Sequence, residues 1–130
     1  MKMITGGAFQ GKREYAEKTF AIDKIDMISG SECTSESIFT ARCIYDFHLF
    51  IRRMLDAGAD TIELVQQLSE NNPDIIIITD EIGAGIIPIE REDRIWRETV
   101  GKVCCLLAER SETVVRICCG IPMVIKGNVL

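Results

Sequence analysis

The chain has 130 residues, of which 47% are hydrophobic and 27% charged, enough apolar material for a single domain over residues 1–130 with its own core. The net charge of −5 argues against binding to nucleic acid or to an anionic membrane, so any phosphate site has to be local. We see no targeting signal and no apolar run of about 18 residues, and we expect a cytoplasmic protein.

The first predicted elements enclose a phosphate-binding loop. A strand is expected at residues 1–5 and a helix at 13–18, and the G-x-x-x-x-G-K motif between them has the strand-loop-helix context that it requires. Glycines let the backbone approach a polyphosphate, backbone N–H groups point at its oxygens, and the lysine adds a positive charge. The expected phosphate-binding residues are Gly6, Gly7, Ala8, Phe9, Gln10, Gly11, Lys12 and Arg13. The alternative is an ordinary glycine-containing turn before a surface Lys-Arg pair.

Arg13 stands where this motif normally carries Ser or Thr. That hydroxyl binds Mg²⁺, which a guanidinium cannot do, although a guanidinium can neutralise phosphate charge. The loop therefore predicts that a small nucleotide binds, and it leaves the participation of Mg²⁺ open.

The next predicted elements are a strand at residues 24–28 and a long helix at about 35–57, where apolar residues recur with helical spacing up to Gly58. His48 is the only histidine and lies at the margin of the apolar side of this helix. It is a candidate catalytic group, because histidine serves as a nucleophile or a base when a partner orients it. The alternative is that His48 only packs there.

Asp60 is predicted to cap a further helix that ends near Asn71-Asn72-Pro73. Residues 75–78, four isoleucines, are predicted to form a buried strand of a parallel sheet. Asp80 and Glu81 follow this strand, as the acidic residues of a Walker B element do. Both are candidate Mg²⁺ ligands, and Glu81 is also a candidate catalytic residue. The carboxyl ends of parallel strands share one edge, where the phosphate loop is expected too. The alternative is an ordinary polar strand end or helix cap.

The last predicted elements are a helix at 90–110 with Trp96, Val100, Val103 and Leu107 on one side, a strand at 113–118, and an antiparallel edge strand at 123–126. Strands that alternate with helices predict an α/β fold with a mainly parallel sheet. None of the six cysteines forms a C-x-x-C pair, so we expect reduced, buried thiols rather than a zinc site.

The carboxyl-terminal half resembles a known enzyme family. Its motifs are Thr-Asp-Glu-Ile-Gly-Ala-Gly-Ile-Ile-Pro at 79–88, Arg94-x-Trp96-Arg97-Glu98-x-x-Gly101-Lys102, and Gly120-Ile121-Pro122 before Lys126. Their order and spacing are similar to the N/D-E-V-G-x-G-I-V-P loop, the R-x-F-R-D-x-x-G-R helix and the S-G-I-P-x-x-x-K strand of the adenosylcobinamide kinase/adenosylcobinamide-phosphate guanylyltransferase family. The amino-terminal loop resembles that family's G-G-x-R-S-G-K-S, and the matches cover roughly half of the chain.

The resemblance implies a P-loop α/β fold, GTP or ATP as a ligand, a corrinoid as the second substrate, and a place in cobalamin biosynthesis. It also implies a homo-oligomer, in that family a trimer. Carried over by position, it adds Gly83, Gly85, Pro88, Arg94 and Arg97 to the expected nucleotide-binding residues.

The sequence departs from the family pattern at three places. Arg13 replaces the serine, with Phe9-Gln10 in place of Arg-Ser; Cys104-Cys105 replaces an Asn-Gln pair; and the segment in which the family keeps the histidine that accepts GMP has no counterpart here. Two functions therefore stay open: an enzyme that transfers a phosphoryl or guanylyl group to a corrinoid, and a non-catalytic descendant with a binding or regulatory role. A third, a general small-nucleotide kinase, has no recognisable acceptor motif.

Overall fold

Six strands form one sheet in the order β2-β3-β4-β1-β5-β6 in the computed structural model, which describes residues 1–83 and 87–128. The strands are β1 (Lys2–Gly6), β2 (Met27–Ser29), β3 (Cys43–Tyr45), β4 (Ile76–Asp80), β5 (Thr113–Cys118) and β6 (Ile121–Lys126). The first five in this order run parallel, and β6 pairs with β5 in the antiparallel direction at the edge. The mainly parallel α/β sheet predicted from the sequence is therefore confirmed.

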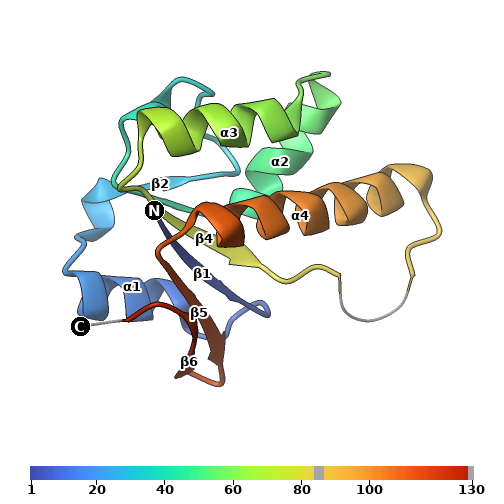
Figure 1. The fold of residues 1–130 in the computed structure, drawn as a ribbon. Coiled ribbons are helices and arrows are strands. Elements are labelled where there is room, and N and C mark those ends of the chain that lie inside the picture. The colour runs from blue at the N-terminus through green and yellow to red at the C-terminus, as the bar shows by residue number, and fades with distance from the viewer. Residues whose placement is uncertain (84–86, 129–130) are drawn as a thin grey trace.

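Helices cover both faces of the sheet (Figure 1). Helix α1 (Lys12–Phe20) lies on one face, and α2 (Phe47–Asp56), α3 (Thr61–Asn71) and α4 (Arg91–Arg110) lie on the other. Two short 3₁₀ helices, η1 (Lys24–Asp26) and η2 (Ser37–Phe39), precede β2 and β3. No helix among the described residues is long and apolar enough to cross a membrane.

The central strands are buried on both faces, because alternate side chains enter two separate hydrophobic clusters. Met3 and Ile77 pack under α2, α3 and α4, whereas Ile4 and Ile78 pack under α1. Full burial of an aliphatic side chain of this size contributes about 1.5–3 kcal/mol. This two-sided burial explains the unbroken isoleucine run at 75–78 and fixes the register that brings Gly6 opposite Asp80.

The predicted helix at 35–57 is wrong. The segment contains η2, then β3, and only then α2, which begins at Phe47. Cys43 and Ile44 are both fully buried but enter opposite clusters, as adjacent residues of a strand do. The apolar residues of β3 and α2 together imitate helical spacing. Asp46, with φ of 52°, separates the two elements.

Apart from the strand predicted at 24–28, the other predicted elements are confirmed within a few residues. The side chain of Asp60 accepts a hydrogen bond from the backbone N–H of Glu63 (3.1 Å) and caps α3 as expected. Helix α4 and strand β5 have nearly the predicted bounds, and β6 is the expected antiparallel edge strand. In place of the predicted strand at 24–28, η1 leads into the short β2.

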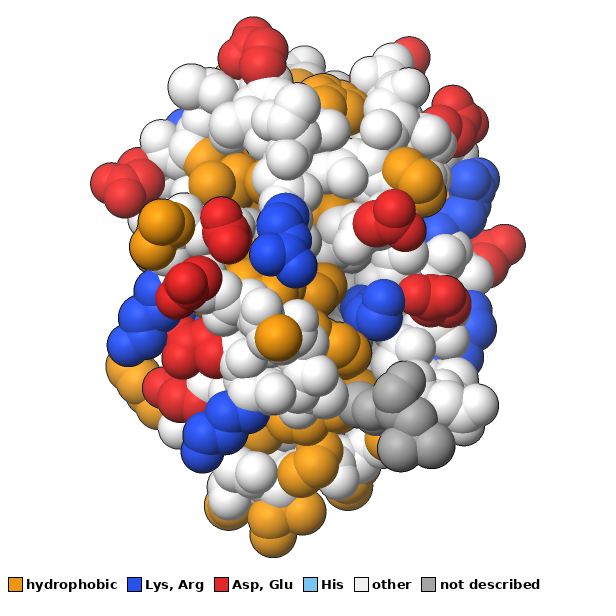
Figure 2. Space-filling view, turned by 90° about the vertical axis from the view of Figure 1, so that its left-hand side faces the viewer, with side chains coloured by type: hydrophobic (Ala, Val, Ile, Leu, Met, Phe, Trp, Pro, Cys, Tyr) orange, Lys and Arg blue, Asp and Glu red, His pale blue; other side chains and the backbone are white. Residues whose placement is uncertain are grey.

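Strand β6 leaves a hydrophobic surface. Ile121, Val124 and Ile125 are 50–65% exposed and Met123 is 42% exposed. Figure 2 shows hydrophobic side chains gathered at the lower end of the molecule, where Figure 1 places the β5–β6 hairpin. Over the rest of the face in Figure 2, acidic and basic side chains are interspersed.

Candidate functional site

The phosphate loop begins where β1 ends, at the carboxyl edge of the sheet. Gly6 has φ of 150°, and a Cβ on it would collide with the backbone carbonyl of Ile117 on β5. Gly11, with φ of 92°, is the N-cap of α1. Both backbone conformations favour glycine, so the two glycines of the motif are required by the shape of the loop. The exposed Phe9 lies at the tip, with φ of 59°.

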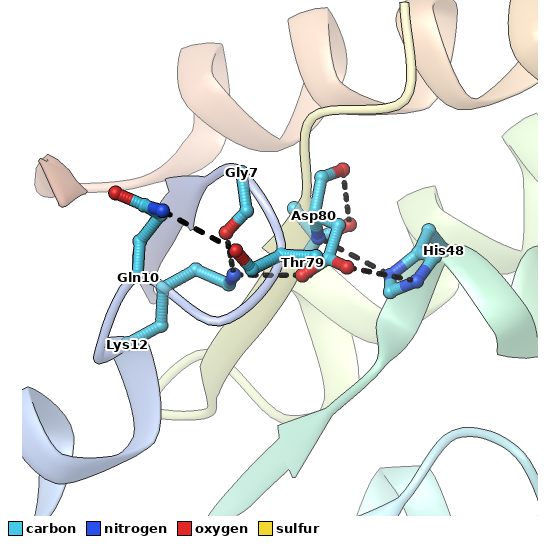
Figure 3. A network of polar contacts seen from close by, with 7 residues as sticks. Gly7, Gln10, Lys12, His48, Thr79 and Asp80 are labelled. Carbon is cyan, nitrogen blue, oxygen red and sulfur yellow. Dashed lines mark hydrogen bonds and ion pairs between the residues drawn. The ribbon is translucent and has the colours of Figure 1, made fainter. Parts of the chain in front are cut away.

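Lys12 is buried at the first position of α1, only 7% exposed. Its Nζ donates to the backbone carbonyl of Gly7 at 2.6 Å and lies 2.7 Å from Oδ1 of Asp80 (Figure 3). The ammonium group thus lies inside the loop and is held by two oxygen atoms. The carbonyl of Gly6 also accepts the backbone N–H of Glu81 at 2.9 Å, which ties the loop to the end of β4.

His48 lies on the other side of Asp80 from Lys12 (Figure 3). The backbone N–H of Asp80 donates to Nδ1 of His48 at 3.2 Å, and Nε2 lies 3.5 Å from Oδ2 of the same residue. The ring stacks on Trp96, whose indole N–H donates to the backbone carbonyl of His48 at 2.7 Å. His48 is therefore held between β4 and α4, and only 6% of its surface is exposed.

Burial lowers the pKa of His48 from its ordinary value of 6.5; the carboxylates of Asp80 and Asp46 oppose this shift, and Lys12 adds to it. The imidazole is neutral at pH 7. Because Nδ1 accepts a backbone hydrogen, the single ring proton belongs on Nε2, where it faces Asp80. Both ring nitrogens are engaged with Asp80, which is the geometry of a group that orients a carboxylate.

Asp46 is a third polar group at this edge. Asp46, His48 and Asp80 each bring a potential ligand atom within 4.8 Å of the others. Two of these groups are carboxylates, which Mg²⁺ and Mn²⁺ accept as ligands. Next to Asp46, the guanidinium of Arg13 lies over the ring of Tyr45, with its Cζ 4.0 Å from the ring centroid, which is a cation–π contact.

These residues line one cavity of about 400 Å³ at the carboxyl edge of the sheet. It is bounded by the loop and start of α1 on one side, by the β3–α2 junction on the other, and by β4 at its floor. The lining residues are Ala8, Phe9, Gln10, Gly11, Lys12, Arg13, Glu14, Tyr45, Asp46, His48, Leu49, Ile78 and Asp80. Its volume falls within the range of small-molecule sites.

Gln10 fastens the loop to the β5–β6 turn. Its side-chain Oε1 accepts the backbone N–H of Cys119 at 2.6 Å, and its backbone carbonyl accepts the N–H of Gly120 at 3.0 Å. The side-chain Nε2 donates to the carbonyl of Ala8 at 3.4 Å. The tip of the loop therefore depends on the carboxyl-terminal hairpin for part of its shape.

A family model described as cobinamide kinase / cobinamide phosphate guanyltransferase matches residues 46–125, which is more than half of the chain. The chain belongs to this family. The family resemblance and the P-loop α/β fold expected from the sequence are thereby confirmed. No curated protein matched the chain. The match begins at Asp46 and does not include residues 6–13. The assignment of these residues as a phosphate-binding loop therefore depends on their own motif and geometry.

In this member of the cobinamide kinase / guanyltransferase family, the residues expected around the nucleotide divide into two groups. The loop residues Ala8 to Arg13 share their cavity with Asp80 and His48. Glu81, Gly83 and Arg97 instead line a second cavity between the end of β4 and α4.

Arg94 lies apart from the loop. Arg94 is exposed and donates to the backbone carbonyl of Pro88 at 3.3 Å, in the loop that leads into α4. Gly85 lies outside the described residues. Glu81 accepts two hydrogen bonds from Arg116 of β5, at 2.8 and 3.0 Å.

The sequence interpretation missed Asp46, Tyr45 and Arg116. Asp46 follows directly after a strand, the same signal that indicated Asp80, but the strand had been merged into a helix. Arg116 is a lone charge inside an apolar strand, which could have indicated a partner at the strand end.

Proposed function

We propose that this chain binds GTP or ATP through residues 6–13 and acts on a corrinoid in cobalamin biosynthesis. The observation that supports this most is the position of Lys12. Its ammonium group lies in the loop between the carbonyl of Gly7 and Asp80, where the terminal phosphate oxygens of a nucleotide can replace both partners. The family match supplies the corrinoid and the kinase or guanyltransferase class of reaction.

Each group of the loop cavity then has a role. The backbone N–H groups of the loop and of the start of α1 bind the phosphates. Lys12 moves from Asp80 to the phosphate oxygens and stabilises the charge that develops on the transferring group. His48 holds Asp80 in place through Nδ1 and Nε2, so we assign it a positioning role rather than that of a nucleophile.

The residues present fit a magnesium ion in spite of Arg13. Its guanidinium lies over the ring of Tyr45, and the carboxylates of Asp46 and Asp80 would hold the ion. When bound, Mg²⁺ supplies a positive charge that neutralises the phosphate oxygens. Asp46 would then supply the oxygen ligand that the missing hydroxyl supplies in other phosphate loops. Glu81 is paired with Arg116 and lines the second cavity, so we assign it no role as a metal ligand.

The test is calorimetric titration of GTP and of ATP, each with and without Mg²⁺, into the natural protein and into Lys12→Ala. We expect the natural protein to bind at least one nucleotide, and Lys12→Ala to weaken that binding about tenfold or more, because a charge-assisted contact is lost. Consumption of GTP or ATP in the presence of adenosylcobinamide or its phosphate tests the reaction. If the natural protein binds neither nucleotide, the proposal fails.

A second candidate function is a non-catalytic nucleotide-binding or regulatory protein. The stacking of Arg13 on Tyr45 favours it, because this contact fixes a positive charge where P-loop enzymes present a hydroxyl to the metal. Turnover by the natural protein would exclude this function. Turnover that appears only in Arg13→Ser, together with nucleotide binding by both proteins, would establish it.

A further inference from the structure

Two adjacent cysteines lie where β5 turns into β6. The sequence predicted buried thiols, but the side chains of Cys118 and Cys119 are both exposed. Cys118 ends β5 and pairs with Ile121 of β6, so the turn between the strands consists of Cys119 and Gly120. Both thiols lie outside the two hydrophobic clusters and are accessible to reagents in solution.

Cys119 occupies a position at which cysteine is an unusual residue. Its φ is 53° and that of Gly120 is 76°, and two positive φ angles are what a two-residue hairpin turn of type I′ requires. Such turns favour Asn, Asp or Gly at the first position, because most side chains are strained at positive φ. The geometry of the turn therefore gives no reason for a cysteine, and the reactivity of the thiol is the property that distinguishes it.

The same turn supports the phosphate loop. Oε1 of Gln10 accepts the backbone N–H of Cys119 at 2.6 Å, and the backbone carbonyl of Gln10 accepts the N–H of Gly120 at 3.0 Å. The two segments are close together, since a Cβ on Gly11 would lie 3.6 Å from the Cα of Gly120. The N–H that the Gln10 side chain binds belongs to the peptide bond between the two cysteines, so a change in this peptide changes the support of the loop.

A disulfide between Cys118 and Cys119 would change this peptide. Consecutive Cα atoms lie about 3.8 Å apart across a trans peptide bond, whereas disulfide-bonded cysteines normally have Cα atoms at least about 4.4 Å apart. The bond can therefore close only if the backbone between the two residues moves. The strain that remains makes such a disulfide easy to reduce, which is the property of a reversible modification.

We propose that Cys118 and Cys119 are a site of reversible oxidation by low-molecular-weight disulfides, and that the disulfide between them releases the phosphate loop from the β5–β6 turn. In the first step, the thiolate of one cysteine attacks a sulfur of the reagent, whose S–S bond breaks, and one thiolate leaves and is protonated. In the second step, the other cysteine attacks the protein sulfur of this mixed disulfide, and the second thiolate leaves and is protonated. Two protein thiols are oxidised, and one small disulfide is reduced to two thiols.

The oxidised form binds nucleotide more weakly. Movement of the peptide between the cysteines removes the N–H that Gln10 accepts, so the tip of the loop is no longer held in place. Part of the binding free energy is then used to order the loop. This effect on affinity rests on the proposed function, whereas formation of the disulfide does not depend on it.

The first measurement detects the disulfide. The natural protein is treated with oxidised glutathione, the remaining thiols are alkylated, and trypsin cleavage after Arg116 and Lys126 releases a peptide that contains these two cysteines and no other. Mass spectrometry should find this peptide without alkylation and lighter than its reduced form by two hydrogen atoms. A peptide that carries glutathione or is fully alkylated would overturn the inference.

The second measurement is calorimetric titration of GTP and ATP before and after oxidation. We expect oxidation to weaken binding about fivefold or more, the effect of one hydrogen bond of ordinary strength, and dithiothreitol to restore it. Cys119→Ser should bind as the reduced natural protein does and not respond to oxidised glutathione. The matched control Cys105→Ser, at an exposed cysteine of α4, should respond as the natural protein does. Unchanged affinity in the disulfide form would contradict release of the loop.

Thermal unfolding checks that each variant is folded, and Cys118→Ser replaces Cys119→Ser if the latter does not fold. Hydrogen exchange separates this inference from the proposed function. If the reduced natural protein binds neither nucleotide, the proposed function fails, and exchange at the backbone amides of residues 6–13 decides the inference. Faster exchange in the oxidised protein supports a released loop, and equal exchange in both forms overturns it.

Discussion

Asp80 is contacted from two sides by side chains that come from opposite faces of the sheet. Lys12 reaches it from α1 at 2.7 Å, and His48 reaches it from α2 through two contacts. The carboxylate is 21% exposed, and both neighbours are almost fully buried. Its orientation is therefore set before any ligand arrives, which is the condition for a preorganised site.

The neutral imidazole of His48 makes the stability of the protein depend on pH. Burial lowers the pKa of His48 in the folded state, whereas the unfolded chain keeps the ordinary value of 6.5. Between the folded-state pKa and 6.5, the unfolded chain therefore binds a proton that the folded chain does not. Stability is expected to fall as the pH drops below about 6.5, with a slope of at most about 1.4 kcal/mol per pH unit for one proton. Urea unfolding of the natural protein from pH 7.5 down to about 5.5 measures this slope.

The control is His48→Asn, whose side-chain oxygen can accept the backbone N–H of Asp80 but cannot titrate. The variant should lose the part of the pH dependence that the histidine contributes. An identical slope in both proteins over this range would assign the dependence to other groups and contradict a neutral, buried His48.

At the level of elements, α3 shows how one side chain starts a helix. Asp60 accepts the N–H of Glu63 and satisfies one of the backbone donors that have no partner within the helix. Asp60→Ala should lower the free energy of unfolding by about 1 kcal/mol. The shift in the urea midpoint measures it. Asp60→Ser keeps a capping oxygen and should stay close to the natural protein, whereas equal losses in both variants would show that the cap is not the cause.

The sequence allowed those elements to be predicted whose signal is local. The isoleucine run of β4, the cap of α3 and the glycine loop each carry their own chemistry within a few residues. Strand β3 has only three residues and gains its stability from its place between β2 and β4, so nothing within Cys43–Tyr45 distinguishes it from the helix that follows.

Of the residues in the candidate site, too, the sequence indicated those with a local signal and missed those without one. Lys12 and Asp80 were found because a strand end and a loop motif indicate the same sheet edge. Asp46 was missed together with β3. The pairing of Glu81 with Arg116 joins residues 35 positions apart, and sequence spacing gives no information about such a pair.

At the level of the whole molecule, β6 exposes apolar side chains along an open sheet edge. Because the family resemblance implies a homo-oligomer, we expect a second copy of the chain to cover this strand. Ile125 is 63% exposed, and Ile125→Glu should shift the protein toward the monomer in sedimentation velocity without loss of folded structure. Ile25→Glu, at a side chain of η1 that is 85% exposed, is the matched control. A natural protein that is monomeric at high concentration would contradict the expectation.

The tie between Gln10 and the β5–β6 turn joins the phosphate loop to this same edge. A nucleotide that reshapes the loop acts on Cys119 and Gly120, and a neighbouring subunit that holds the hairpin acts on the loop. Thermodynamic linkage requires such effects to be reciprocal. Affinity for nucleotide should then change with protein concentration over the range where subunits assemble, and saturating nucleotide should shift the assembly equilibrium by the same factor.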